Sequence, residues 1–230
     1  MNELNGLGLY LVCLIPPLLL GLYAQFKLKS TYERYSRVPV GTGLTGAQAA
    51  REILDSAGLP NMAIMEVPGH LSDHYDPIKK RLCLSSENYH GRSLAAVGVA
   101  AHEAGHALQH KASYVWLNLR MALVPITNIA SGGAMVLFFL GMFLSMAKLA
   151  VLGIIIYSVI FAFQLITLPV EYDASRRAKI ELSRLGIVHP GESGGVASVL
   201  NAAALTYVAA MVQTLMTLIY FIMLSRSGNR

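Results

Sequence analysis

The stretch "AHEAGHALQH" (101–110) places three histidines four residues apart, with Glu103 directly after the first. If this stretch is helical, His102 and His106 project from one face with a rise of about 6 Å between them, so both imidazoles can reach one ion. Zinc binds such nitrogens at about 2.0–2.1 Å, and a neighbouring glutamate can take a proton from water at the open coordination position. These residues match the H-E-x-x-H pattern of zinc peptidases, with Glu103 as the general base. The alternative, two histidines that bind no ion, fits poorly with the Ala, Val and Gly residues around them.

A catalytic zinc site needs three protein ligands and one open position, so a third ligand is missing. His110 continues the four-residue spacing, but it lies eight residues beyond His102, a rise of about 12 Å. His102 and His110 could bind one ion only if the helix bent sharply between them. The metzincin motif provides that bend with a glycine, whereas no glycine follows His106 before Gly132. We expect His110 to lie beside a ligand or on the helix surface instead of binding the metal.

Glu171 and Asp173, in "LPVEYDASRRA" (168–178), are rare acidic residues at the end of an apolar segment. Acidic groups at a membrane boundary are usually functional, although carboxylates also favour the start of a helix because of its dipole. Two membrane crossings separate Glu171 from His106, and two crossings return the chain to the same side. We expect Glu171 to be the third ligand and Asp173 to orient a histidine by accepting a hydrogen bond. The reverse assignment, with Asp173 as the ligand, stays open.

The composition indicates a membrane protein. Hydrophobic residues make up 54% of the 230 and charged residues only 13%, against about 25% charged in soluble domains. Four long segments contain no Asp, Glu, Lys or Arg, and each exceeds the roughly 20 apolar residues that cross a bilayer as a helix. They predict transmembrane helices near 6–26, 121–144, 148–168 and 204–224. Polar residues dilute the last of these, for which a buried amphipathic helix is the alternative.

Lysine and arginine set the predicted orientation. Of the 18 in the chain, 11 lie in 27–120 and 4 in 169–203, so the positive-inside rule puts both segments in the cytoplasm. The basic residues are scattered without aromatic neighbours, so nucleic-acid binding is not expected. The predicted layout is an N-terminal transmembrane helix over 1–26, a cytoplasmic catalytic part over 27–120, a transmembrane hairpin over 121–168, a cytoplasmic helix over 169–203 and a C-terminal transmembrane helix and tail over 204–230.

The polar segments show helix signals. Thr45 and Ser93 are candidate N-caps, the second for the helix that carries the histidines. Pro169 is expected to end or kink the third membrane helix. Helices are predicted over 45–60, 93–114 and 171–186, and a loop over 188–195.

Alternating apolar residues over 62–85 predict short strands on either side of a "DHYDP" turn. The strand 81–85 could form a sheet edge to which an extended peptide adds through main-chain hydrogen bonds. Two cysteines are too few for a structural site of the zinc-finger type, and no disulfide is expected between them. The prediction is a mainly α membrane protein with about four transmembrane helices and a small α+β, zincin-like cytoplasmic part.

Four segments resemble one known family, in the same order along the chain: "LSDHYDPIKKRLCLS", "VAAHEAGHALQH", "LPVEYDASRRA" and "VLNAAALTYVAA". Together they resemble the YugP-like neutral zinc metallopeptidases of bacterial membranes, over nearly the whole chain. The Glu171 segment is also similar to the E-x-x-A-D helix of the HtpX-like membrane proteases, in which the glutamate is a zinc ligand. Here Ser175 replaces the last aspartate of that pattern and Asp173 comes early, which puts the role of Asp173 in more doubt than that of Glu171.

The resemblance implies a zinc peptidase of the bacterial inner (plasma) membrane, with Zn²⁺ as cofactor and a cytoplasmic active site. With the motif, it predicts a gluzincin-like endopeptidase that cleaves peptides or membrane-protein loops with zinc-activated water. The rival prediction is a non-proteolytic scaffold or regulatory protein whose zinc site is structural or inactive. Glu103 argues against it, because a structural site needs no base. The lipid bilayer is an expected partner, whereas a homo-oligomer or a membrane partner protein is left open.

Overall fold

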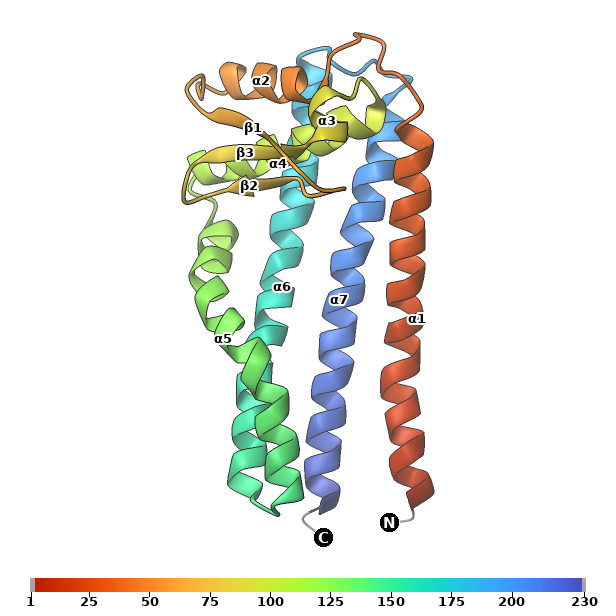
Figure 1. Ribbon diagram of the computed structural model, residues 1–230, viewed down its shortest axis with the longest axis vertical. Coiled ribbons are helices and arrows are strands. Elements are labelled where there is room, and N and C mark those ends of the chain that lie inside the picture. The colour runs from red at the N-terminus through yellow and green to blue at the C-terminus, as the bar shows by residue number, and fades with distance from the viewer. Residues whose placement is uncertain (1–2, 229–230) are drawn as a thin grey trace. The chain divides into compact units, whose positions relative to one another are not determined.

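The computed structural model describes residues 3–228, most of which are helical (Figure 1). The elements, in chain order, are α1 (Glu3–Tyr35), α2 (Gly46–Ser56), β1 (Ala63–Val67), β2 (His74–Asp76), β3 (Arg81–Ser85), α3 (Ser86–His90), α4 (Leu94–Lys111), α5 (Val115–Phe143), α6 (Ala147–Arg184) and α7 (Ser193–Gly228). The chain forms two compact units. The helical unit comprises the segment up to Gln25, Asn118–Leu168 and the segment from Thr206, and the mixed unit comprises Phe26–Leu117 and Pro169–Leu205. The outermost residues of the predicted segments 1–26 and 204–230 lie outside the described range.

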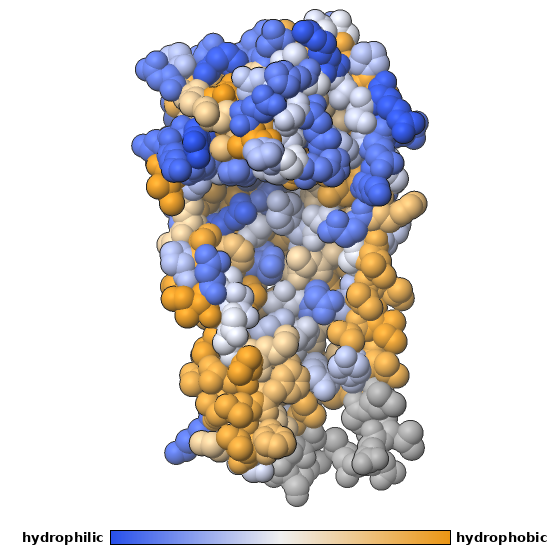
Figure 2. Space-filling model, in the orientation of Figure 1, coloured by the Kyte–Doolittle hydropathy of each residue, from blue (hydrophilic) through white to orange (hydrophobic). Residues whose placement is uncertain are grey.

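The helical unit consists of helices long and apolar enough to cross a membrane. Within the described residues, α1, α5, α6 and α7 each hold a candidate span, and at most 17% of its most apolar window is buried. Leu18, Ile129 and Phe143 are 50%, 81% and 86% exposed, and Figure 2 shows apolar side chains over much of the visible surface of these helices. A surface of this kind is stable against lipid and unstable against water. The predicted mainly α membrane protein with four spans is confirmed.

Close packing joins the helices inside this unit. The rings of Phe138 in α5 and Phe221 in α7 stack with their centroids 4.1 Å apart. A Cβ added at Gly153 in α6 would lie 2.6 Å from the backbone nitrogen of Phe138. Because lipid tails are as apolar as the side chains, helices in a bilayer associate through such contacts and not through the hydrophobic effect.

Helices α6 and α7 are longer than their apolar patterns predict. Pro169 lies inside α6, so the predicted helices 148–168 and 171–186 are one element. Proline removes a single main-chain hydrogen bond, and the long flanking segments keep the helix continuous. Likewise α7 begins at Ser193, inside the predicted loop 188–195. Hydropathy detects only the lipid-facing part of a helix and not its continuation into a polar unit.

The mixed unit contains a three-stranded sheet in the order β1-β3-β2. Strand β3 pairs in parallel with β1 and antiparallel with β2. The prediction that 81–85 forms a sheet edge was therefore wrong, because β3 is the central strand and its residues after Arg81 are buried. The edges are β1 and β2. The short β2 lies within the predicted "DHYDP" turn, and the turn follows it, where Asp76 accepts hydrogen bonds from the backbone of Ile78 and Lys79.

Two capped helices complete the core of the mixed unit. Thr45 and Gln48 form a capping box at the start of α2, and the Ser93 side chain accepts from the backbone of Ala96 at the start of α4. Both predicted N-caps are confirmed. The fully buried side chains of this core include Ile53, Leu54, Leu82, Leu84, Val97 and Leu182.

Backbone contact between α4 and α6 depends on Gly105, inside the histidine motif. A Cβ added there would lie 2.5 Å from the carbonyl oxygen of Ala174, closer than such atoms approach one another. Glycine is the one residue that leaves this space empty. The middle of the H-E-x-x-H motif therefore brings α4 against the part of α6 that carries Glu171.

We expect Gly105→Ala to reduce the free energy of unfolding by about 1–3 kcal/mol, because the added methyl group forces two packed helices apart. Denaturant unfolding in detergent measures this loss. Gly194→Ala in α7 is the matched control, because a Cβ there meets no heavy atom within 4 Å. Equal stability of the two variants would show that the close approach at Gly105 has no energetic role.

Candidate metal centre

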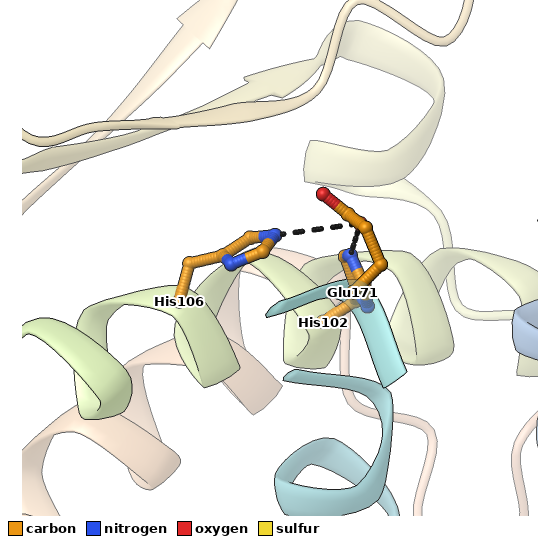
Figure 3. A group of neighbouring side chains, drawn as sticks. All are labelled: His102, His106 and Glu171. Atoms are coloured by element: carbon orange, nitrogen blue, oxygen red, sulfur yellow. Dashed lines mark hydrogen bonds and ion pairs between the residues drawn. The ribbon is translucent and has the colours of Figure 1, made fainter. Parts of the chain in front are cut away.

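Three potential metal ligands from two helices lie together in the mixed unit. His102 and His106 stand on successive turns of α4, and Glu171 comes from α6, two residues after Pro169. One nitrogen from each histidine and one carboxylate oxygen all lie within 4.8 Å of one another. The Glu171 Oε2 atom is 3.2 Å from His102 Nε2 and 3.7 Å from His106 Nε2 (Figure 3).

This donor set fits zinc. Ligand atoms about 2.0–2.2 Å from a tetrahedral ion lie roughly 3.3–3.6 Å from one another, close to the two separations between Glu171 and the histidines, 3.2 and 3.7 Å. Two imidazoles and a carboxylate also make up the protein ligands of several catalytic zinc sites, with the fourth position left for water or substrate. His106, His102 and Glu171 would hold the ion.

The burial of Glu171 is costly unless a cation balances its charge. Its side chain is only 2% exposed, and an isolated buried carboxylate is strongly unfavourable. Burial alone raises the pKa of Glu171, but the interactions with His102 and His106 outweigh it and hold the pKa below its usual range. Glu171 is therefore an anion at neutral pH, as a metal ligand must be.

Glu103 is also buried, at 8% exposure, but its pKa moves in the opposite direction. Burial raises the pKa of Glu103 to about 7, against the attraction of His102, and the negative charge of Glu171 raises it further. A favourable interaction with the backbone of Tyr75 in β2 partly offsets the rise. A carboxyl group with such a pKa can accept a proton and release it again near neutral pH.

Each histidine has a polar partner at the ring nitrogen that faces away from Glu171. His102 Nδ1 lies 3.1 Å from Ser175 Oγ, and His106 Nδ1 lies 3.0 Å from Gln109 Oε1. The motif pattern predicts neither partner. Their signal in the sequence is weak: a polar residue one turn after His106, and another one turn after Glu171.

The two residues expected to support the site make different contacts. Asp173 accepts hydrogen bonds from Arg176 at 2.5 Å, from Arg177 at 2.5 Å and from Gln109 Nε2 at 3.1 Å. Asp173 is thus linked to His106 through Gln109, whose Oε1 lies 3.0 Å from His106 Nδ1. His110 Nδ1 pairs with Tyr75 Oη at 2.8 Å. Among the residues that the structure describes, the group of candidate ligands consists of His102, His106 and Glu171. Asp173 and His110 are not part of it, which favours Glu171 over Asp173 as the third ligand.

Comparison with known proteins shows the family to which the chain belongs. The family model described as "Putative neutral zinc metallopeptidase" matches residues 10–226. The chain belongs to this family. It is 48% identical over 221 residues to the protein described as "Putative membrane protease YugP" of Bacillus subtilis (strain 168), covering 96% of this chain and 98% of that protein. No solved structure matches. The resemblance seen in the four sequence segments is thus confirmed.

We expect Glu171→Ala to abolish retention of zinc after dialysis, because two histidines alone leave the ion without its anionic ligand. Asp173→Asn should retain zinc with an affinity reduced by about 10–100-fold at most, the usual effect of a residue that acts through a ligand. Metal analysis of the purified proteins and competition with a chelator measure both. Zinc lost from the Asp173 variant and kept by the Glu171 variant would reverse the assignment.

Proposed function

We propose that this chain is an integral membrane zinc endopeptidase of the bacterial inner membrane, with its active site at the cytoplasmic face. The observation that carries the proposal is the convergence of a partly buried His102 with the buried His106 and Glu171, next to a buried Glu103. Membership of the metallopeptidase family supports it. A structural zinc site would need the ligands but not a buried carboxyl group beside them.

The residues divide the chemistry between them. A bound zinc ion would lower the pKa of a water molecule and polarise the carbonyl group of the scissile bond. Glu103 takes a proton from the attacking water and delivers it to the nitrogen of the leaving amine. His102, His106 and Glu171 keep their positions throughout, because α4 and α6 are packed backbone to backbone at Gly105.

Strand β2 is the proposed docking edge for the substrate backbone. It lies at the edge of the sheet, and the backbone of its residue Tyr75 interacts with Glu103. Strand β2 therefore passes beside the Glu103 carboxylate. An extended peptide that adds to this edge through main-chain hydrogen bonds would pass close to the catalytic group. Substrates of this kind are flexible peptides or exposed loops of membrane proteins.

The location at the cytoplasmic face follows from charge. The segments 27–120 and 169–203, which supply the residues of the site, hold 11 and 4 of the 18 lysines and arginines. Positive charge near the membrane is kept on the cytoplasmic side. With four spans, both termini then lie outside.

We expect Glu103→Gln to reduce peptide cleavage by about 10²–10⁴-fold, the contribution of a positioned general base. Zinc content should stay the same, because Glu103 is not a ligand. Cleavage of casein or a fluorogenic peptide by the zinc-loaded protein in detergent measures the activity. Glu52→Gln, the same change at an exposed site on α2, is the matched control. Full activity of the Glu103 variant would exclude the proposed mechanism, whereas no cleavage by the unmodified, zinc-loaded chain would favour a scaffold or regulatory role.

The orientation is tested with single cysteines in a variant that lacks Cys13 and Cys83. A cysteine added at the C-terminus should react with a membrane-impermeant maleimide from outside intact cells. A cysteine at Glu52 should react only after the cells are opened. A C-terminal cysteine that is protected in intact cells would contradict the four-span orientation.

A further inference from the structure

Gln109 is a buried amide with three hydrogen-bond contacts, two of which join the two ligand-bearing helices. Its side chain has no exposed surface. It lies on α4, one turn after His106, and both of its hydrogen-bond acceptors lie on α6: the Val170 carbonyl oxygen at 2.7 Å and Asp173 Oδ2 at 3.1 Å. A buried amide is stable only when its donors and its acceptor are satisfied.

The contacts with α6 determine which way the amide points. A backbone carbonyl such as that of Val170 can only accept, and Asp173 is an acceptor held by Arg176 and Arg177. The reverse orientation would put Oε1 of Gln109 against two other acceptor oxygens. The NH₂ group therefore faces α6, and Oε1 faces Nδ1 of His106 at 3.0 Å.

The amide orientation in turn decides where the proton of His106 lies. Because Oε1 has no hydrogen to give, Nδ1 must carry one and donate it. A neutral imidazole has one N–H, so Nε2 is left with its lone pair. Nε2 is the nitrogen that faces Glu171. We propose that Gln109 is a positioning residue that holds His106 in the Nδ1–H form, with Nε2 ready to bind metal; this deepens the proposed zinc peptidase function and rests on it.

Gln109 and Glu171 have opposite effects on which ring nitrogen of His106 carries the proton. In the absence of metal, the Glu171 carboxylate attracts a proton to Nε2 of His106, which would block the nitrogen needed by zinc. The neighbouring contact of His102 differs, since the hydroxyl group of Ser175 can either donate or accept. Ser175 therefore does not determine the tautomer of His102, and the proposal applies to His106 alone.

The test uses ¹⁵N NMR of histidine-labelled, zinc-free protein in detergent at a pH where the ring is neutral, with His106→Asn to assign the signal. In the unmodified chain, His106 should carry its proton on Nδ1. Gln109→Met keeps the shape and removes the acceptor, so the proton should move to Nε2 and zinc affinity should fall by about 10–100-fold. Ser175→Ala is the matched control, and the His106 signal should keep its Nδ1–H pattern.

A proton on Nε2 in the unmodified chain, or a Met variant with unchanged tautomer and affinity, would overturn the proposal. If Gln109→Met does not fold, Gln109→Glu replaces it in the test. Its carboxyl oxygen can still accept a hydrogen bond from His106, so the proton should stay on Nδ1 although the contact with α6 is disturbed. Nε2–H in that variant would refute the positioning role. None of these measurements requires peptide cleavage. A chain that binds zinc but cleaves no peptide would therefore contradict the peptidase function without affecting the conclusion about the His106 tautomer.

Discussion

The close approach of α4 and α6 is the constraint on which the site depends. The pairs of residues that meet across this contact run in opposite directions along the two helices: His102 with Ser175, Gly105 with Ala174, and Gln109 with Val170. The helices are therefore antiparallel here, and a slide of one turn would break every pair at once. This register places the Glu171 carboxylate opposite two imidazoles, and the absence of a side chain at Gly105 permits it.

The chemistry-bearing residues could be predicted from the sequence because each has a local or topological signal. The spacing of His102 and His106 reflects the helical repeat, and Glu103 follows from the motif. Glu171 is detectable because acidic groups are rare at the end of an apolar segment, and because an even number of crossings returns the chain to the same side. The spans are equally visible, since every lipid-facing residue contributes to the same hydropathy signal.

The remaining contacts could not be predicted, because they arise only when distant segments meet. Gln109 looks like any polar helix residue until Val170 and Asp173 are placed beside it. The edge position of β2 depends on the pairing of β1 with β3, which are distant in the sequence. Strand β2 itself has only three residues, too few to show a clear alternation of apolar and polar side chains. The continuation of α6 through Pro169 depends on packing of the polar segment that follows the proline, which outweighs the local preference of proline to end a helix.

The division of the mixed unit into two separate stretches of chain has a consequence for biosynthesis. Glu171 follows His106 by 65 residues, with the hairpin of α5 and α6 between them. During translation His102, Glu103 and His106 emerge first, and the Glu171 carboxylate emerges only after most of the hairpin has been made. A ribosome-bound or incompletely inserted chain thus lacks a closed metal site. The order of synthesis delays assembly of the candidate metal site until both stretches of the mixed unit have been made.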